Sequence, residues 1–512
     1  MTQFTTADLE QLKQKGISEA SVEKQLESFR VGFPYLKIDS PSGVGQGITP
    51  VDEELQAFAC NRWDGFLSEG GEVVKFVPAS GAASRMFKAL FAFVNSGEDK
   101  AEEGSPVAEL IANIEKFAFY SDLNATTLKL YGLGIEELKA AGRQSDIVKA
   151  LILPEGLNYG GLPKALLKFH RYNGESVTAL EEQLAEGAEM AANRDGIVNV
   201  HFTVSSNHRK LFEEKLAETI PAMESKLGVH YQVSMSEQKP STDTIAVTPD
   251  NELFRDENGK LVFRPGGHGA LIENLNDIDS AVVFIKNIDN IAHKGVRKES
   301  VPYKKVLGGM LLLVHDRIEA LTAKLKGNYT HEDIEEATAF VGGILCTKSL
   351  ALDNATDDAA AAAEILNILD RPLRVCGMVR NEGEPGGGPY NAWASDGQSI
   401  APQILESSQI DLSKDENKEL MAKASHFNPV DLACYIKRTD GSRYNLQDYV
   451  DHATGFISSK SLGGRELRAL ELPGLWNGAM SKWNTVFIEV PAYTFTPAKT
   501  VNDLLRSAHQ AD

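Results

Sequence analysis

The stretch VKFVPASGAASRMFKALFAF, residues 74–93, changes its hydrophobic period halfway along. Its first six residues are typical of a buried strand, whereas Met86, Leu90 and Phe93 recur at helical spacing. The change falls between Pro78 and Arg85, in a turn of small residues. Such a turn before a helix N-terminus exposes backbone N–H groups, which favour anions and above all phosphates. The stretch therefore predicts an anion-binding loop.

The chain that follows alternates between strand and helix patterns. Helices are expected over 177–193 and 207–227, and strands at IVNVHFTVS, HYQVSMS and SAVVFIKNIDNI. This alternation predicts an α/β fold with a mostly parallel, doubly wound sheet. Three of the strands end in the polar or glycine-rich turns SGAASR, SSNHR and NIDN. Ligands of open parallel sheets bind outside the carboxyl ends of the strands, so we expect the site there.

Composition and charge limit the classes of partner. The 512 residues are 42% hydrophobic and 24% charged, with a net charge of -20, as in an acidic globular protein. This charge opposes non-specific binding to nucleic acid or to an anionic membrane, so a phosphate site must be a local basic pocket. The four cysteines have no CxxC pairing and signal neither zinc nor a disulfide framework. With no signal pattern and no long apolar run, we expect a cytoplasmic protein.

Three regions are expected along the chain. Residues 1–70 form an N-terminal helical segment with an irregular stretch, DSPSGVGQGITP, from Asp39. Residues 71–300 form the α/β domain, with a helical insertion at about 96–158. Residues 301–512 form a C-terminal α+β region in which helices precede strands near RVCGMV, DLACYIK and NTVFIEV.

Four pieces of the sequence between residues 73 and 290 resemble the nucleotide-sugar pyrophosphorylases. ASGAASRM is similar to their G-x-G-T-R loop, with Gly81, Ala83, Ser84 and Arg85 in the corresponding places. GLPKAL is similar to their P-K element, with Lys164 as the lysine. PGGHGAL at 265–271 resembles the glycine-rich loop that meets the base and sugar in uridylyltransferases, and IKNIDNI resembles their strand ending in Asp-Asn. The whole chain also resembles a bacterial protein family of similar length, which implies no activity.

The sequence departs from the pyrophosphorylase pattern in three places. Ala83 replaces a loop glycine, and Ser80 stands where many members have the first glycine. The chain between Arg85 and Lys164 is much longer than the usual short link. These departures put catalysis in doubt more than nucleotide binding.

The resemblance implies a Rossmann-like nucleotidyltransferase that joins a nucleoside triphosphate, with UTP as the expected nucleotide, to a sugar 1-phosphate and releases pyrophosphate. Arg85 and Lys164 would then be catalytic contacts to the phosphates, and Asp289 would hold Mg²⁺. The other implied contacts are to the nucleotide, from Ser80, Gly81, Ala82, Ala83, Ser84, Gly266, Gly267, His268 and Gly269, and to the sugar, from Asn290.

Each motif also has an ordinary structural interpretation. A glycine-rich turn is commonly only a tight connection, and GLPKAL alone is typical of a helix start with a solvated lysine. His268 could be a turn residue with its ring in water, and Asp-Asn is a common turn former. The order and spacing of all four motifs favour nucleotide binding. The main alternative is a non-catalytic nucleotide or nucleotide-sugar binding protein on the same fold.

The segment RNEGEPGGGPYNAW, residues 380–393, is a further candidate. Arg380, Glu382 and Glu384 offer a cation and two carboxylates for a sugar phosphate and sugar hydroxyls. The three consecutive glycines predict either unusual backbone angles or a loop that closes over the sugar, and a plain surface turn is the alternative. A third function remains open: a different sugar-phosphate enzyme whose site lies in this segment.

Overall fold

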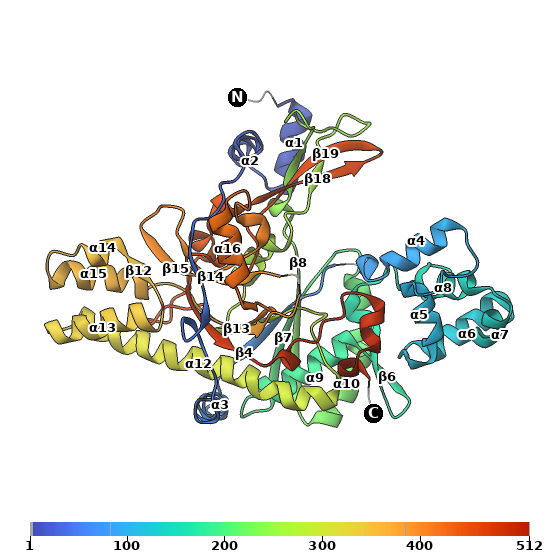
Figure 1. Cartoon of the computed structure of the whole chain (residues 1–512), viewed down its shortest axis with the longest axis horizontal. Coiled ribbons are helices and arrows are strands. Elements are labelled where there is room, and N and C mark those ends of the chain that lie inside the picture. The colour runs from blue at the N-terminus through green and yellow to red at the C-terminus, as the bar shows by residue number, and fades with distance from the viewer. Residues whose placement is uncertain (1–3, 82, 385, 511–512) are drawn as a thin grey trace. The chain divides into compact units, whose positions relative to one another are not determined.

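The computed structural model describes residues 4–81, 83–384 and 386–510, so Ala82 lies outside the described residues. The chain forms two compact units (Figure 1). Unit 1 comprises residues 1–62, 238–285 and 307–490, and unit 2 comprises residues 63–237, 286–306 and 491–512. The region boundaries expected near residues 70 and 300 stay predictions.

Unit 2 contains the strand and helix of the opening stretch, at the predicted places. Strand β4 (Val73–Pro78) pairs in parallel with β7 (Ile197–Val204), which pairs in parallel with β8 (His230–Glu237). Helices α9 (Ala179–Ala191) and α10 (Arg209–Leu227) share one apolar cluster with these strands. Strands joined through helices that cover a sheet face are the expected α/β arrangement.

The segment expected to be a helical insertion is helical. Figure 1 shows α4–α8 gathered together, and their apolar side chains form one cluster that includes Leu90, Leu110, Leu123 and Ile147. The remaining elements of unit 2 are the hairpin and these helices, with the bounds β5 (Lys168–Tyr172), β6 (Glu175–Thr178), α4 (Lys88–Ser96), α5 (Pro106–Ala112), α6 (Tyr120–Tyr131), α7 (Ile135–Ala140) and α8 (Gln144–Ile152).

The last residues of the described chain belong to unit 2, not to the C-terminal strands. Ala498, Val501 and Leu504 lie in the same apolar cluster as the helical insertion. Two short 3₁₀ turns, η11 (Val501–Leu505) and η12 (Ser507–His509), carry this segment. The segment 491–510 therefore packs with the predicted phosphate loops.

Unit 1 is a mixed α/β structure whose strands run in both directions. Strands β2, β3, β20, β13, β17 and β11 are neighbours in that order, with β13 parallel to β20 and antiparallel to β17. Two further sheets, β1-β14-β15-β12 and β10-β9-β19-β18, are antiparallel where their pairing is defined. The expected parallel pattern holds in unit 2, whereas the chain as a whole is mixed.

The strands of unit 1 have the following bounds: β1 (Ile38–Pro41), β2 (Gly43–Val44), β3 (Gly47–Thr49), β9 (Thr244–Val247), β10 (Phe263–Arg264), β12 (Lys348–Ser349), β13 (Leu373–Arg380), β14 (Gly388–Trp393), β15 (Ser399–Leu405), β16 (His426–Phe427), β17 (Asp431–Tyr435), β18 (Phe456–Leu462), β19 (Arg465–Glu471) and β20 (Asn484–Glu489). Its helices are α1 (Thr6–Lys15), α2 (Glu19–Val31), α11 (Ile272–Asn276), α13 (His331–Gly343), α14 (Leu350–Asp353), α15 (Asp358–Leu369) and α16 (Asp415–Lys423). Three elements have residues in both units: α3 (Glu53–Ser68), β11 (Val282–Lys286) and α12 (Lys294–Lys326).

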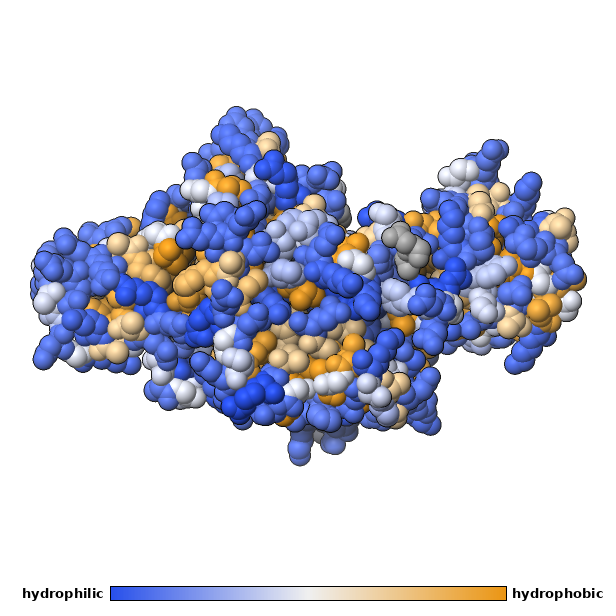
Figure 2. Space-filling view, turned by 90° about the horizontal axis from the view of Figure 1, so that it is seen from below, coloured by the Kyte–Doolittle hydropathy of each residue, from blue (hydrophilic) through white to orange (hydrophobic). Residues whose placement is uncertain are grey.

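The surface is mostly hydrophilic on the face drawn in Figure 2, with apolar groups scattered among polar ones. Within the described chain, none of the helices combines the length and the apolar character needed to span a membrane.

A buried histidine lies on β7. Nδ1 of His201 is 2.7 Å from Ser234 Oγ, Nε2 is 2.8 Å from Ser236 Oγ, and the ring stacks on Phe76. Burial lowers the pKa of His201 from 6.5 to about 4. The native protein therefore keeps this ring neutral at pH values where an unfolded chain would protonate it.

We predict that this histidine makes the protein less stable in mild acid. As the pH falls from about 6.5 to 4, the unfolded chain binds a proton that the native state does not, which costs about 2 kcal/mol by pH 5. The melting temperature of the His201→Gln variant should therefore fall less between pH 7 and pH 5 than that of the unchanged protein. His230→Gln, at an exposed position of β8, is the control. Equal losses for His201→Gln and the unchanged protein would contradict the prediction.

Candidate functional site

The predicted phosphate loop follows β4 directly. Ala79 N donates to Thr203 O at 2.9 Å, which extends the pairing of β4 with β7 by one residue. The N–H groups of Ser80 and Gly81 have no hydrogen-bond partner among the described residues. Ala83 N, by contrast, donates to Leu162 O at 2.9 Å, and the nucleotide contact expected of Ala83 stays a prediction.

The glycine of this loop has open space beside it. A Cβ atom added at Gly81 would meet no other heavy atom within 4 Å among the described residues. Packing within the protein therefore gives no reason for glycine at this place. A ligand that approaches the exposed backbone closely would give one.

The GLPK loop lies between the phosphate loop and the turn that follows β7. Leu162 O accepts from the phosphate loop, as described above, and Gly161 O lies 3.0 Å from His208 Nε2. His208 is fixed in turn by Ser205 Oγ, 2.8 Å from its Nδ1. The predicted turns SGAASR and SSNHR thus both contact residues 161–162, as expected for loops at one edge of a sheet.

Lys164 lies at the start of a short 3₁₀ turn, η3 (Lys164–Leu166), directly after Pro163. Its Nζ donates to Asp289 Oδ2 at 2.8 Å and to Ala498 O at 2.9 Å. The side chain is only 15% exposed. The sequence-based alternative of a solvated lysine at a helix start is therefore wrong, because this ammonium group is held by two acceptors.

Asp289 lies at the centre of the site, 9% exposed and in contact with two lysines. Besides Lys164, Lys499 Nζ lies 3.1 Å from Asp289 Oδ2 and 3.4 Å from Oδ1. Burial by itself raises the pKa of Asp289, but the two ammonium groups outweigh it and hold the pKa below its usual value. The three side chains form what we call the Asp289 cluster, with one more positive than negative charge.

The sequence analysis missed Lys499. It lies far from the other motifs along the chain, and no spacing or glycine pattern marks it. Backbone hydrogen bonds place Lys499 beside Asp289. Ala498 N donates to Asp289 O at 3.0 Å, and Val501 N donates to Met86 O at 3.2 Å. The segment around Lys499 is thereby tied both to the strand-end turn NIDN and to the phosphate loop.

Asn290 contributes to the fold of unit 2. It is only 1% exposed, and its Oδ1 accepts from Thr496 N at 2.9 Å. Its carboxamide therefore holds the C-terminal segment in place. Contact of Asn290 with a sugar hydroxyl stays a prediction.

Helix α9 supports the turn that carries Asp289. Gln183 Nε2 donates to Asn287 O at 3.0 Å, and Gln183 O accepts from the buried Lys75 at 2.7 Å. One helical turn further on, Glu186 forms ion pairs with Lys75 and Lys286. Burial raises the pKa of Glu186, but these two lysines outweigh it and leave the carboxylate ionised. A buried network of ion pairs thus supports the turn that carries Asp289.

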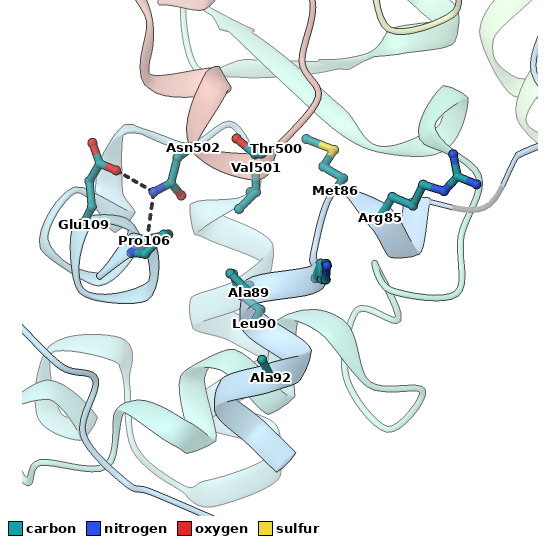
Figure 3. A pocket seen from close by; sticks show the side chains of 11 residues that line it. Arg85, Met86, Ala89, Leu90, Ala92, Pro106, Glu109, Thr500, Val501 and Asn502 are labelled. Carbon is teal, nitrogen blue, oxygen red and sulfur yellow. Dashed lines mark hydrogen bonds between the residues drawn. The ribbon is translucent and has the colours of Figure 1, made fainter. Parts of the chain in front are cut away.

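Arg85 is exposed, and no hydrogen bond or ion pair holds its guanidinium among the described residues. In Figure 3 its side chain points away from Met86 and Leu90, which line an apolar pocket between α4, α5 and η11. This pocket has a volume of about 540 Å³. On its far side, Asn502 donates to Glu109 Oε2 at 2.7 Å (Figure 3).

The predicted base loop belongs to unit 1, and its glycines have a structural explanation. A Cβ at Gly266 would lie 2.6 Å from Thr242 O, and one at Gly269 would lie 2.1 Å from Pro473 O. The chain's own backbone therefore fills the space beside these two glycines and explains why they are glycine. His268 stacks on Trp476 at 4.4 Å and accepts from Leu475 N, so its ring does not lie in water. Gly267, with φ 77°, completes the turn, and base binding by this loop stays a prediction.

The segment 380–393 is not one moving loop. Residues 388–393 form β14, which pairs with β1 and β15. A Cβ at Gly387 would meet the side chain of Ile404, and one at Gly388 would meet that of Tyr390. Arg380 is the last, exposed residue of β13, and Glu382 N donates to Glu384 Oε2 at 3.0 Å. Their sugar contacts stay predictions, and residues 388–393 belong to a sheet and not to a loop.

A family model described as "Domain of unknown function (DUF4301)" matches residues 5–510. The chain belongs to the DUF4301 family. None of the curated proteins matches it. The resemblance of the whole chain to one protein family, noted from the sequence, is thus confirmed.

Solved structures similar to this DUF4301 chain include three trypanosomatid enzymes. The UDP-N-acetylglucosamine pyrophosphorylase of Trypanosoma brucei is 11% identical, with a TM-score of 0.47 and coverage of 98% of this chain and 79% of that one. A variant of the UDP-glucose pyrophosphorylase of Leishmania major is 13% identical, with a TM-score of 0.44 and coverage of 100% and 80%. The enzyme named UDP-glucose phosphorylase from Trypanosoma brucei is 14% identical, with a TM-score of 0.43 and coverage of 98% and 77%. At these values the likeness assigns no activity to this chain.

We predict that Asp289→Asn destabilises the protein by about 3 kcal/mol, because the mostly buried Lys164 loses its charge partner. Removing Lys164 as well should recover part of this loss. The melting temperature of Asp289→Asn/Lys164→Met should therefore fall by less than the sum of the falls in the two single variants. Thermal melting of the single and double variants measures both quantities. Asp415→Asn is the control, because Asp415 is 91% exposed in a surface ion pair. Additive losses would show that the two residues do not act as a pair.

Proposed function

We propose that this protein is a nucleotidyltransferase that joins a nucleoside triphosphate to a sugar 1-phosphate, giving a nucleotide-sugar and pyrophosphate. The observation that carries the proposal is the meeting of three strand-end turns and the GLPK loop around the Asp289 cluster. Ala83 N contacts Leu162 O, His208 contacts Gly161 O, and Lys164 contacts Asp289. This is the edge of a sheet where phosphate ligands of α/β proteins bind.

The cluster supplies positive charge in an acidic protein. Lys164 and Lys499 carry two positive charges against one carboxylate, and Arg85 adds a third cation near the same loops. Met86, which follows Arg85, is bonded to Val501, two residues after Lys499. Three cations and the exposed N–H groups of Ser80 and Gly81 suit two bound polyanions.

The reaction needs positioning more than covalent chemistry from the protein. The phosphate oxygen of the sugar 1-phosphate attacks the α-phosphorus of the triphosphate in line, the P–O bond to the β-phosphate breaks, and pyrophosphate leaves. In this scheme the exposed loop N–H groups and Arg85 bind the β- and γ-phosphates. Lys164 bridges the α-phosphate and the sugar phosphate. Preorganised cations stabilise charge on the transferring and leaving groups.

Asp289 is the residue we assign to Mg²⁺. Mg²⁺ binds through one or two carboxylates together with substrate phosphates, so a single aspartate fits such a site when phosphates share it. Bound there, the cation would supply Lewis-acid stabilisation of phosphate charge. Because both oxygens of Asp289 lie within 3.4 Å of a lysine Nζ, the lysines must turn toward the phosphates for the cation to enter.

The nucleobase and sugar contacts are the less defined part of the proposal. We assign the base, with uracil as the expected one, to the loop of Gly266, Gly267, His268 and Gly269, and the sugar to Arg380, Glu382 and Glu384. These residues belong to unit 1. The base assignment comes from the sequence resemblance, and the sugar assignment comes from the cation and two carboxylates of the segment 380–393.

We predict that pyrophosphate is released when one nucleoside triphosphate from a panel is mixed with a sugar 1-phosphate and Mg²⁺, with UTP the best nucleotide. Arg85→Ala should lower kcat/KM at least about a hundredfold, because it removes one charge partner of the transition state. Its melting temperature should not change, because Arg85 is exposed. Lys129→Ala, an exposed lysine of α6, is the matched control for surface charge.

The results separate the nucleotidyltransferase from the non-catalytic binding protein. Normal turnover by Arg85→Ala would remove this loop from the active site. Binding of a nucleotide or nucleotide-sugar, seen as a rise in melting temperature, without pyrophosphate release from any pair would favour the non-catalytic binding protein. The absence of both would overturn nucleotide binding itself.

A further inference from the structure

Lys499 and Lys164 contact the same carboxylate but are held very differently. Lys164 is 15% exposed and has a second acceptor, Ala498 O, at 2.9 Å. Lys499 is 56% exposed, and its Nζ contacts only Asp289, at 3.1 and 3.4 Å, among the described residues. Separating Lys499 from Asp289 therefore costs less free energy than separating Lys164 from it.

The backbone of Lys499 is fixed, so only its side chain needs to move. The carboxylate of Asp503 accepts from the N–H groups of Lys499 and Thr500, at 2.8 and 2.6 Å. The bonds of Ala498 and Val501 to Asp289 O and Met86 O hold the segment on both sides. A lysine side chain on a fixed backbone can turn by rotation about its own bonds.

The charges of the cluster oppose a lone divalent cation. Two ammonium groups and one carboxylate leave a net positive charge around Asp289, and Lys499 is the only group that contacts Oδ1 among the described residues. A metal ion that arrives alone meets like charge and an occupied ligand. A polyphosphate that arrives draws the ammonium groups to itself and leaves the carboxylate available.

We propose that Lys499 is a displaceable cation that occupies Asp289 until phosphate groups draw it away, so that Asp289 binds a divalent cation only together with its anionic ligand. This inference rests on the proposed function, because it takes polyphosphate as the ligand of the cluster. It assigns to the C-terminal segment a role in the order of binding. One side chain then serves as a ligand for phosphate and as a block against premature metal binding.

The test uses the full-length protein, with Mn²⁺ alone and inorganic tripolyphosphate alone as probes. Free Mn²⁺ is measured by electron paramagnetic resonance, and tripolyphosphate binding without metal is measured by calorimetry. Lys499→Met keeps the length and apolar stem of the side chain but removes its charge. We expect Mn²⁺ to bind at least about tenfold more tightly to this variant, and tripolyphosphate about tenfold more weakly. The opposite directions are decisive, because general damage to the site would weaken both.

Three further variants make the result specific. Lys499→Gln should shift both affinities in the same directions as Lys499→Met. Lys499→Met/Asp289→Asn should lose the gained Mn²⁺ affinity, which assigns that affinity to Asp289. Lys129→Met, on the exposed face of α6, should bind both probes as the unchanged protein does.

The inference is overturned if Mn²⁺ binds equally to Lys499→Met and Lys129→Met, or if both affinities fall together in Lys499→Met. Failure of this inference is distinguishable from failure of the proposed function. Opposite shifts without any pyrophosphate release would sustain the displaceable cation and refute the transferase. Turnover together with an unshifted Mn²⁺ affinity in Lys499→Met would sustain the transferase and refute the displaceable cation.

Discussion

A buried carboxylate that stays ionised needs cations beside it, and this need connects the distant parts of unit 2. Asp289 is 9% exposed and receives Lys164 from the GLPK loop and Lys499 from the C-terminal segment. An unpaired charge at this depth would cost several kcal/mol, so Asp289 must keep at least one of the two lysines, and Lys164 is the one that a second acceptor holds in place. The same contacts bring together three segments that are far apart in sequence, and those segments form the walls of the candidate site.

The two glycine-rich loops of the sequence differ in what approaches them. Beside Gly81 there is open space, whereas Gly266 and Gly269 leave room for the carbonyl oxygens of Thr242 and Pro473. Glycine permits close approach in both cases, and at Gly81 the open space leaves room for a ligand. This contrast favours the first loop as a ligand site, and it explains the second as a joint between two parts of unit 1.

Much of the local structure could be predicted from the sequence. The switch from β4 to a turn and then α4, the parallel strands β4, β7 and β8, and the helices of the insertion follow from hydrophobic period alone. Two hairpins were missed although their turns carry a signal. Asn173-Gly174 joins β5 to β6 and Gly463-Gly464 joins β18 to β19, and all four residues have positive φ. Such pairs suit the two-residue turns of hairpins.

The sequence by itself determined the strand-end turns and the candidate residues Arg85, Lys164 and Asp289, and it predicted anion binding by the first turn, because each lies within a short pattern of period, glycine or charge. Only the tertiary structure decided that Lys499 completes the cluster, that Asn290 is used by the fold and that residues 388–393 form a strand. These facts depend on contacts between segments hundreds of residues apart. A local sequence pattern does not predict such contacts, because the free energy that favours them comes from burial and charge pairing in the folded chain.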